Sequence, residues 1–201
     1  MLKIILATHN SHKINEIKSF FNDFNAEIIS MNEIGIYDEI EENGESIEEN
    51  ALIKARWIKE KVDNGIIIAD DTGLFVDYLN GQPGVYSARF AGENATYDDN
   101  NKKLLKLLEG VPFEKRKAHF KTVIAIINGD SEHILEGRID GYIIEKPVGE
   151  NGFGYDPLFY VPEIKKTLAE MKTEEKNKIS HRALALQKLK EYLKINLEED
   201  R

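Results

Sequence analysis

The residues best suited to chemistry in this chain are two adjacent carboxylates, Asp70 and Asp71, which follow the unbroken apolar run Ile66-Ile67-Ile68-Ala69. A run of β-branched residues predicts a central strand that is buried on both faces. Carboxylates at the end of such a strand repel each other and are costly to desolvate, so they usually bind a cation or activate a water molecule. We therefore expect Asp70-Asp71-Thr72-Gly73 at the carboxyl end of the strand, where open α/β sheets bind ligands. An Asp-rich turn without such a role is the alternative.

Two glycine-based nucleotide motifs are absent from the sequence. The strand before Asp70 resembles the metal-holding strand of P-loop ATPases, but none of the 14 glycines is followed by lysine, so no G-x-x-x-x-G-K-[ST] loop exists. The segment Gly152-Phe153-Gly154-Tyr155-Asp156-Pro157 is not a dinucleotide fingerprint, because proline stands at the third glycine position. Its glycines would instead let the backbone approach a flat ligand while an aromatic ring stacks on it, and Asp156 could accept a hydrogen bond from a base or ribose. Both rings could equally belong to the core.

A candidate phosphate site comes early in the chain, in Thr8-His9-Asn10-Ser11-His12-Lys13. The pattern predicts the end of a strand, a polar turn and the start of a helix with a lysine in its first turn. The helix dipole opposes a cation there by about 0.3–1 kcal/mol unless an anion compensates it. Backbone N–H groups, hydroxyls and Lys13 could therefore bind phosphate. An ordinary strand-to-helix connection with an exposed lysine is the alternative.

An acidic stretch precedes and opens the next expected helix. Most of its glutamates fit a solvated face, although one of them could complete the oxygen shell of a metal ion. Asn50 and Lys54 lie four residues apart, on a different helix face from the apolar stripe. The glutamates are Glu41, Glu42, Glu45, Glu48 and Glu49.

Near the C-terminus, Lys176 is followed by Ser180-His181-Arg182 at an expected helix start. Arg182 offers a planar fork of donors, and the His181 ring can donate from one nitrogen and accept at the other. The pair suits a purine carbonyl edge or a phosphate. Ser180 as a helix cap with two exposed neighbours is the alternative.

Composition narrows the possible classes of protein. The chain has 201 residues, a formal net charge of -9 and no cysteine. The acidic balance argues against a nucleic-acid binder, and the missing thiols leave oxygen and imidazole ligands, which favour hard cations. No window approaches the roughly 20 apolar residues of a membrane span, and no signal peptide is recognisable, so we expect a cytoplasmic protein without a membrane partner.

Strand-like and helix-like segments alternate, which predicts an α/β protein with a single domain over residues 1–201. The Asn128-Gly129 pair predicts a hairpin, so we expect a mixed sheet rather than a plain parallel one. The expected strands are 3–8, 27–30, 66–69, 117–127 and 132–138, and the expected helices are 13–24, 46–62, 99–108 and 182–197.

Taken together, these segments resemble the inosine triphosphate pyrophosphatase family, whose members hydrolyse ITP, dITP and XTP. Six motifs follow the family order along nearly the whole chain. They are Thr8-x-Asn10-x-x-Lys13, Glu49-Asn50-Ala51-x-x-Lys54-Ala55, Ala69-Asp70-Asp71-Thr72-Gly73-Leu74-x-Val76-Asp77, Gly84-Val85-Tyr86-Ser87-Ala88-Arg89, Phe153-Gly154-Tyr155-Asp156-Pro157 and Ser180-His181-Arg182.

The resemblance implies a long mixed β-sheet flanked by helices, two lobes with a central cleft that holds the active site, and a homodimer. It also implies Mg2+-dependent hydrolysis of a non-standard purine nucleoside triphosphate to the monophosphate and pyrophosphate, which cleanses the nucleotide pool. By its position in the family motif, Asp71 resembles the residue that accepts a proton and also binds the metal ion. Glu41 resembles the second metal ligand of the family. Whether Glu41 or Glu42 fills that place stays open, as does the role of Asp70.

The remaining site residues implied by the resemblance bind the substrate. Two departures from the family pattern lie among them, since His9 and His12 replace small residues and Thr72 replaces serine while keeping the hydroxyl. The substrate-binding positions are Thr8, His9, Asn10, Ser11, His12, Lys13, Lys54, Thr72, Phe153, Gly154, Tyr155, Asp156, Lys176, His181 and Arg182.

Two other functions are compatible with the same residues. One is a related pyrophosphatase acting on modified pyrimidine or standard nucleotides. The other is a nucleotide-binding regulator without turnover, against which the paired acids argue, because without a metal they would repel a polyanion.

Overall fold

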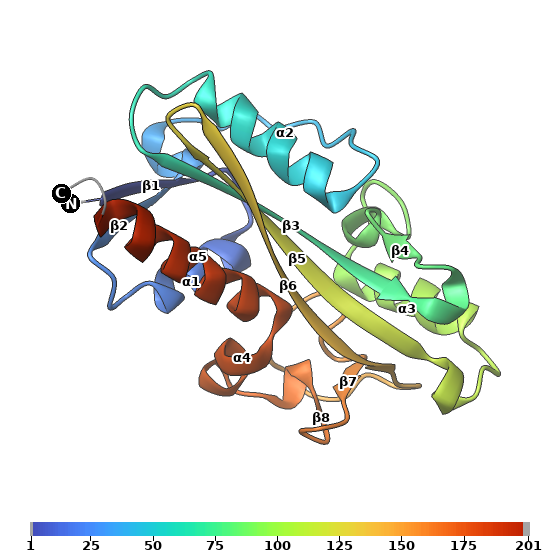
Figure 1. The fold of residues 1–201 in the computed structure, drawn as a ribbon. Coiled ribbons are helices and arrows are strands. Elements are labelled where there is room, and N and C mark those ends of the chain that lie inside the picture. Colours follow the sequence, from blue (N-terminus) through green and yellow to red (C-terminus); the bar gives the residue numbers. More distant parts are fainter. Residues whose placement is uncertain (1, 199–201) are drawn as a thin grey trace. The chain divides into compact units, whose positions relative to one another are not determined.

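The N-terminal part of the sheet is parallel, because helices connect its strands. The computed structural model of the protein describes residues 2–198, in which β1 (Leu2–Leu6) lies between β2 (Ala26–Ser30) and β3 (Ile66–Val76) and pairs in parallel with both. The connections contain α1 (Ser11–Phe20) and α2 (Ile47–Lys59) (Figure 1).

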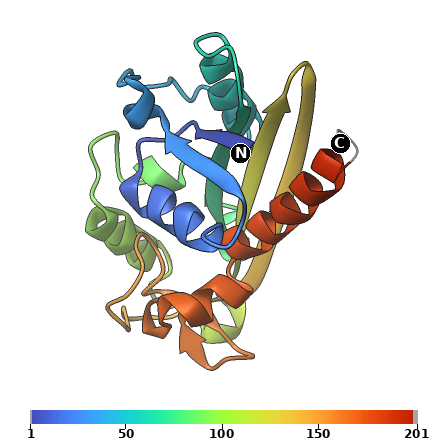
Figure 2. The ribbon, with the colours of Figure 1, turned by 90° about the vertical axis from the view of Figure 1, so that its left-hand side faces the viewer.

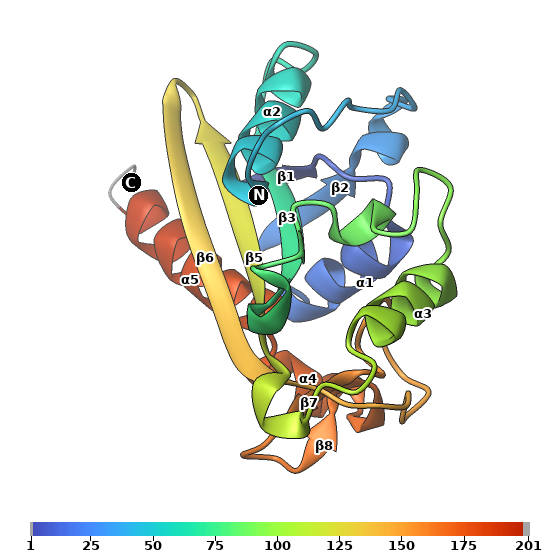
Figure 3. The same ribbon diagram turned by 90° about the vertical axis from the view of Figure 1, so that its right-hand side faces the viewer.

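Residues 2–198 form two compact units, of which the first comprises residues 2–71, 122–136 and 184–198. On one face of its strands, alternate residues such as Ile4, Leu6 and Ile68 pack with α1 and with α5 (His181–Glu198), which both cover this face (Figure 2). Ile5 of β1 and Ile67 of β3, which point to the other face, are buried too, and α2 lies on the opposite side of the sheet from α5 (Figure 3). Burial on both faces explains the unbroken apolar runs.

The second unit comprises residues 72–121 and 137–183 and has its own apolar core. It contains α3 (Tyr97–Leu107), α4 (Thr173–Ile179) and three short strands. Of these, β7 (Phe159–Val161) pairs antiparallel with β8 (Lys166–Thr167), and β4 (Pro83–Gly84) pairs antiparallel with β3.

Three long strands belong to both units. Besides β3 these are β5 (Lys117–Asn128) and β6 (Ser131–Ile143), which are joined by the hairpin predicted at Asn128-Gly129, with Gly129 at φ 58°. The sheet has eight strands in the order β2-β1-β3-β5-β6-β7-β8, with β4 beside β3. Parallel and antiparallel pairs both occur, which confirms the predicted mixed α/β sheet.

The strand expected over residues 66–69 ends too early, because β3 continues through Asp70-Asp71-Thr72-Gly73 to Val76. Leu74 pairs with Gly84 of β4, and a Cβ at Gly73 would lie 2.9 Å from the Gly84 carbonyl oxygen, so the glycine serves a close strand contact. The register with β1, however, ends at the pair Leu6–Ile68. The carboxylates therefore still follow the carboxyl end of the parallel ladder, where the neighbouring strand has stopped.

Several elements are longer or shorter than predicted, and α4, β4, β7 and β8 are missing from the prediction. These four elements are too short to show a periodicity. The strand β6 runs to Ile143 instead of residue 138, past two glycines that weaken a strand pattern. A Cβ at Gly141 would lie 2.4 Å from the Tyr160 carbonyl oxygen, so this glycine permits the pairing of β6 with β7.

Glu33 stabilises the turn after β2 through charge-assisted hydrogen bonds. Its carboxylate accepts hydrogen bonds from the Ser30 amide at 2.7 Å, the Lys18 ammonium at 2.9 Å and the Ser30 hydroxyl at 2.7 Å, and these contacts lower the pKa of Glu33 from 4.5 to about 2. A lowered pKa in the folded state stabilises the protein above pH 4.5, and this contribution is lost as the pH falls towards about 2.

We therefore expect Glu33→Gln to lower the melting temperature at pH 7 by about 1–4 °C, since half-exposed pairs contribute about 0.5–1 kcal/mol. Thermal unfolding from pH 7 down to pH 3 should show this difference shrinking below pH 4.5. The exposed Glu27→Gln on β2 is the matched control and should show no such trend. If the melting temperature of Glu33→Gln differed from that of the wild type by the same amount at every pH, the lowered pKa of Glu33 would not be the cause of the stabilisation.

Candidate functional site

The turn between β1 and α1 is organised by the side chain of Asn10. Its Oδ1 accepts hydrogen bonds from the amides of His12 at 3.0 Å and Lys13 at 3.2 Å, and the Thr8 hydroxyl accepts one from the Asn10 amide at 3.2 Å. Asn10 is thus the N-cap of α1. The turn brings Thr8, Asn10 and Lys13 together, whereas the side chains of Ser11 and His12 are exposed.

Lys13 has a carboxylate partner within the protein. Its Nζ lies 3.1 Å from Oδ2 of Asp70 and 3.4 Å from the Asp70 carbonyl oxygen. Asp70 is 2% exposed, and its charge compensates a cation that the dipole of α1 opposes. This contact gives Asp70 a role that the sequence left undefined, because it holds Lys13 beside the N-terminus of α1.

A second lysine, Lys54 of α2, is buried and contacts two more carboxylates. Its Nζ lies 3.1 Å from Oε1 of Glu42 and 3.6 Å from Oδ1 of Asp71. Burial, the largest single influence, would lower the pKa of Lys54, but the negative charges of Asp71, Glu42 and Asp70 together raise it. Lys54 is therefore a fixed positive charge among three carboxylates.

The glutamates around α2 divide by their contacts. Glu49 Oε2 accepts from the Glu45 amide at 2.6 Å, and the Ser46 hydroxyl accepts from the Glu49 amide at 3.2 Å, which caps α2. Glu42 contacts Lys54, whereas the neighbouring Glu41 is exposed. Most of the acidic stretch thus forms a solvated face and a helix cap, with Glu42 turned to the lysine.

The charges of this cluster fit a divalent cation bound together with a polyanion. Asp70, Asp71 and Glu42 contribute -3, and Lys13 and Lys54 contribute +2, which leaves -1 before Glu41 is counted. Within residues 2–198 no three His, Asp or Glu side chains are arranged to hold a metal ion by themselves. Mg2+ commonly takes only one or two protein carboxylates and completes its shell with water and substrate phosphates. The donor set fits that mode of binding.

In the second unit, a buried ion pair fixes the aromatic segment. Asp156 Oδ2 accepts hydrogen bonds from the Lys176 ammonium at 2.8 Å and the Phe153 amide at 2.9 Å, and both charged side chains are almost fully buried. A Cβ at Gly152, where φ is 74°, would lie 2.1 Å from the same oxygen, so only glycine fits. The Asp156 carboxylate thereby orients Phe153.

The half-buried ring of Phe153 has two cationic neighbours. Nζ of Lys176 lies 5.2 Å and the guanidinium carbon of Arg182 5.5 Å from its centre. Arg182 also donates from Nη2 to the Thr72 hydroxyl at 3.3 Å. Two cations therefore flank a half-buried ring, as an anionic aromatic ligand requires.

Other predicted residues of this unit are buried within the protein. The Tyr155 ring belongs to the apolar cluster, its hydroxyl donates to the Ser87 carbonyl at 2.9 Å, and burial raises its pKa. His181 is 4% exposed and stacks on Phe120 at 4.6 Å between ring centres. Ser180 Oγ accepts from the Ala183 amide at 3.2 Å, which confirms Ser180 as a helix cap, but its two neighbours are buried rather than exposed as that alternative expected.

Two asparagines, Asn50 and Asn101, support segments of the candidate site but were not among the site residues predicted from the sequence. Asn101 donates to the Gly154 carbonyl at 3.0 Å and so supports the aromatic segment, and Asn50 accepts from the Gly44 amide at 2.8 Å. The motif position of Asn50 beside Lys54 was a usable signal for it. Nothing in the sequence marks Asn101, because its partner is 53 residues away.

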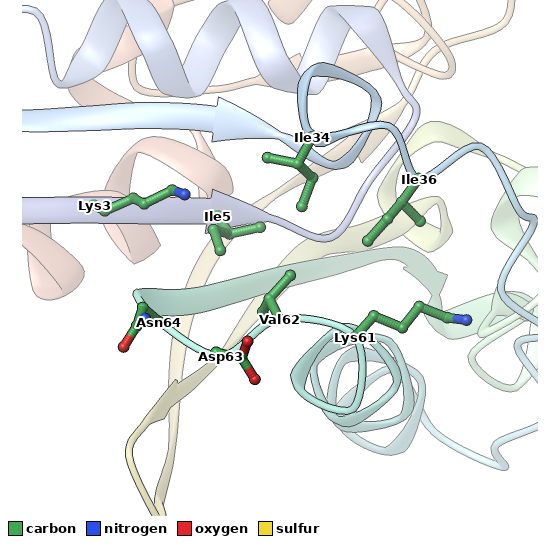
Figure 4. Close-up of a pocket in the computed structure, with 8 residues that line it drawn as sticks. All are labelled: Lys3, Ile5, Ile34, Ile36, Lys61, Val62, Asp63 and Asn64. Atoms are coloured by element: carbon green, nitrogen blue, oxygen red, sulfur yellow. The ribbon is translucent and has the colours of Figure 1, made fainter.

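A cavity of about 300 Å³ in the first unit lies apart from the predicted residues (Figure 4). Its wall mixes aliphatic side chains with lysine and polar groups and includes none of the predicted site residues. The lining residues are Lys3, Ile5, Ile34, Ile36, Lys61, Val62, Asp63 and Asn64.

Among the described residues, no helix is both long and apolar enough to cross a membrane.

The fold and the two lysine–carboxylate clusters define an α/β protein with candidate sites for an anionic ligand. The chain belongs to the Ham1 family, whose model matches residues 4–192. It is 68% identical over 198 residues to a dITP/XTP pyrophosphatase of Thermoanaerobacter pseudethanolicus, covering 98% of this chain and all of that one. The corresponding protein of Clostridium perfringens is 51% identical, with 96% and 98% covered.

Solved structures of the same family share the fold. A HAM1 protein from Coxiella burnetii has a TM-score of 0.88 at 42% identity, covering 96% of this chain and 99% of that chain. The Ham1 protein of Staphylococcus aureus has a TM-score of 0.86 at 40% identity, with the same coverage. The predicted family is thereby confirmed.

The ion pair of Asp156 and Lys176 yields a stability prediction. Asp156→Asn leaves a buried ammonium without its counter-charge, so we expect a loss of about 3–5 kcal/mol in the free energy of unfolding. Denaturant unfolding measures it. Asp140→Asn, the same change in an exposed pair with Arg138, is the control and should have little effect. Equal losses in the free energy of unfolding for the two substitutions would show that the buried ion pair contributes no more to stability than the exposed pair.

Proposed function

We propose that this protein hydrolyses non-standard purine nucleoside triphosphates, namely ITP, dITP and XTP, to the monophosphate and pyrophosphate. One observation carries the proposal, namely that Asp70 pairs with Lys13 in the first turn of α1, while its neighbour Asp71 and Glu42 pair with Lys54. Such a set of opposite charges suits a polyphosphate with its cation. The names of the relatives point to the same reaction.

In this proposal the first unit binds the triphosphate. The turn from Thr8 to Lys13 offers hydroxyls and amides, and the ammonium groups of Lys13 and Lys54 neutralise charge that develops on the phosphates. Catalysis of phosphoryl transfer rests mainly on such positioning and charge stabilisation. Asp70 keeps Lys13 in place, and Lys54 is held by Glu42 and Asp71.

Asp71 and Glu41 would hold Mg2+, which supplies Lewis-acid polarisation of the phosphate oxygens. Glu42 is engaged with Lys54, which leaves the exposed Glu41 for the cation. Asp71, 8% exposed, is the proposed acceptor of a proton from the attacking water. Lys54, at 3.6 Å, keeps the Asp71 carboxylate oriented.

The residues of the second unit are the proposed base-binding set. Phe153 provides the stacking surface, and His181 and Arg182 are the proposed donors to the 6-keto edge, with Lys176 and Thr72 beside them. Gly154, Tyr155 and Asp156 shape this segment. A site that hydrogen-bonds a carbonyl rejects an amino group strongly, because its polar groups would be left unpaired.

Two further features belong to the proposal. The acidic net charge suits a small-molecule substrate rather than nucleic acid, and a nucleotide-pool enzyme would act in the cytoplasm. We also propose a homodimer, as the family resemblance implies.

Pyrophosphate release from ITP, dITP, XTP, ATP and GTP, with and without Mg2+, tests the function. We expect Mg2+-dependent release from the first three and much slower release from ATP and GTP. Asp71→Asn should lower the rate by at least about 100-fold, the usual contribution of a general base, while circular dichroism shows a folded protein. Binding without turnover would indicate a regulator, and turnover of a folded Asp71→Asn near the wild-type rate would remove Asp71 from the mechanism.

The roles of the two adjacent glutamates separate by their Mg2+ dependence. Glu41→Gln should raise the Mg2+ concentration that gives half the maximal rate by about tenfold, as expected for a lost metal ligand. Glu42→Gln should instead lower the maximal rate with a smaller change in Mg2+ dependence, because it releases Lys54. The reverse pattern would assign the metal to Glu42.

A further inference from the structure

The acidic loop, residues 38–44, is held at both ends by side chains from other elements of the first unit. At its start, the His9 ring places Nε2 2.8 Å from the Asp38 carbonyl oxygen. At its end, the Gly44 amide donates to Oδ1 of Asn50 at 2.8 Å. The two glutamates of the proposed mechanism lie between these fixed points.

The buried side-chain amide of Asn50 destabilises the fold unless its hydrogen bonds serve a function. It is 0% exposed on α2, and its Nδ2 makes no hydrogen bond to the described residues. A buried amide with an unsatisfied donor is unfavourable, and packing alone would be served better by an apolar side chain. What the amide provides is an acceptor for Gly44, one helical turn before Lys54, which holds Glu42 of the same loop.

Gly44 allows this contact to form. A Cβ at Gly44 would lie 2.8 Å from Oδ1 of Asn50 and 2.8 Å from Cβ of Glu49, so the loop backbone packs directly on the first turn of α2. The loop cannot shift along the helix without losing this fit.

His9 links the other end of the loop to the candidate phosphate turn. Its Nδ1 lies 2.5 Å from Oδ1 of Asn32, in the turn after β2, while Nε2 faces Asp38. His9 lies between Thr8 and the N-cap Asn10. One ring thus joins the turn that opens α1 to the start of the acidic loop.

We propose that His9 and Asn50 are positioning residues that fix the two ends of the acidic loop, so that Glu41 and Glu42 reach the cation and Lys54. His9 then acts through the loop rather than by contacting phosphate with its ring. This inference rests on the proposed function, because the loop matters only if its glutamates serve the reaction.

The test compares wild type, His9→Ala and Asn50→Ala by three measurements. In metal-free protein, hydrogen exchange of residues 38–46 should be about tenfold faster in each variant, as expected for one lost hydrogen bond. Mn2+ alone, followed by electron paramagnetic resonance, should bind about three- to tenfold more weakly. The Mg2+ concentration for half-maximal pyrophosphate release should rise similarly, while kcat of Asn50→Ala at saturating Mg2+ stays within about threefold.

Two control variants separate positioning from stability. Asn50→Asp keeps the acceptor oxygen and should retain slow exchange of the loop. Ile58→Val, a core change on the same helix, should lower the melting temperature without changing loop exchange. If Asn50→Ala does not fold, the exposed His9 still provides the test.

Unchanged loop exchange and Mn2+ binding in His9→Ala, or an equal increase of exchange in Ile58→Val, would overturn the inference. Wild-type protein without Mg2+-dependent pyrophosphate release would instead refute the proposed function. The two failures are distinguishable, because exchange and Mn2+ binding are measured without nucleotide.

Discussion

The pairing of two lysines with the buried consecutive carboxylates of β3 is the constraint on which the candidate site depends. Asp70 and Asp71 are desolvated neighbours in one strand, and each contacts an ammonium from a different helix, Lys13 of α1 and Lys54 of α2. Removal of either cation would weaken the charge compensation of these buried carboxylates. Both helices must therefore be placed correctly around β3 to balance the two negative charges.

The same physical solution recurs in the second unit with a different result. Asp156 and Lys176 are buried together, but their contact orients an aromatic ring and leaves no excess charge. In the first unit the carboxylates outnumber the lysines, so a further cation is favoured there. Ion pairing thus yields a metal-compatible cluster in one unit and a stacking surface in the other.

The sequence predicted those parts of the fold that depend on local patterns. The apolar run before Asp70, the capping signature at Ser46 and the Asn128-Gly129 hairpin each indicate one element from a few neighbouring residues, and each agrees with the structure. The continuation of β3 beyond the carboxylates was not predictable in this way. It depends on pairing with β4, whose two residues, Pro83 and Gly84, look like a turn.

Within the site, residue types were predictable but partners were not. A lysine in the first turn of a helix indicates a nearby anion, yet that anion is Asp70, 57 residues away. The sequence pattern does not distinguish the two aromatic residues Phe153 and Tyr155, which both follow a glycine. In the structure Tyr155 is a core residue that contacts Ser87, whereas Phe153 is half-buried beside Lys176. Contacts between residues far apart in the sequence therefore decide which polar groups already have a hydrogen-bond or ion-pair partner within the protein. The groups that these contacts leave accessible, rather than the motif as a whole, determine what the site can bind.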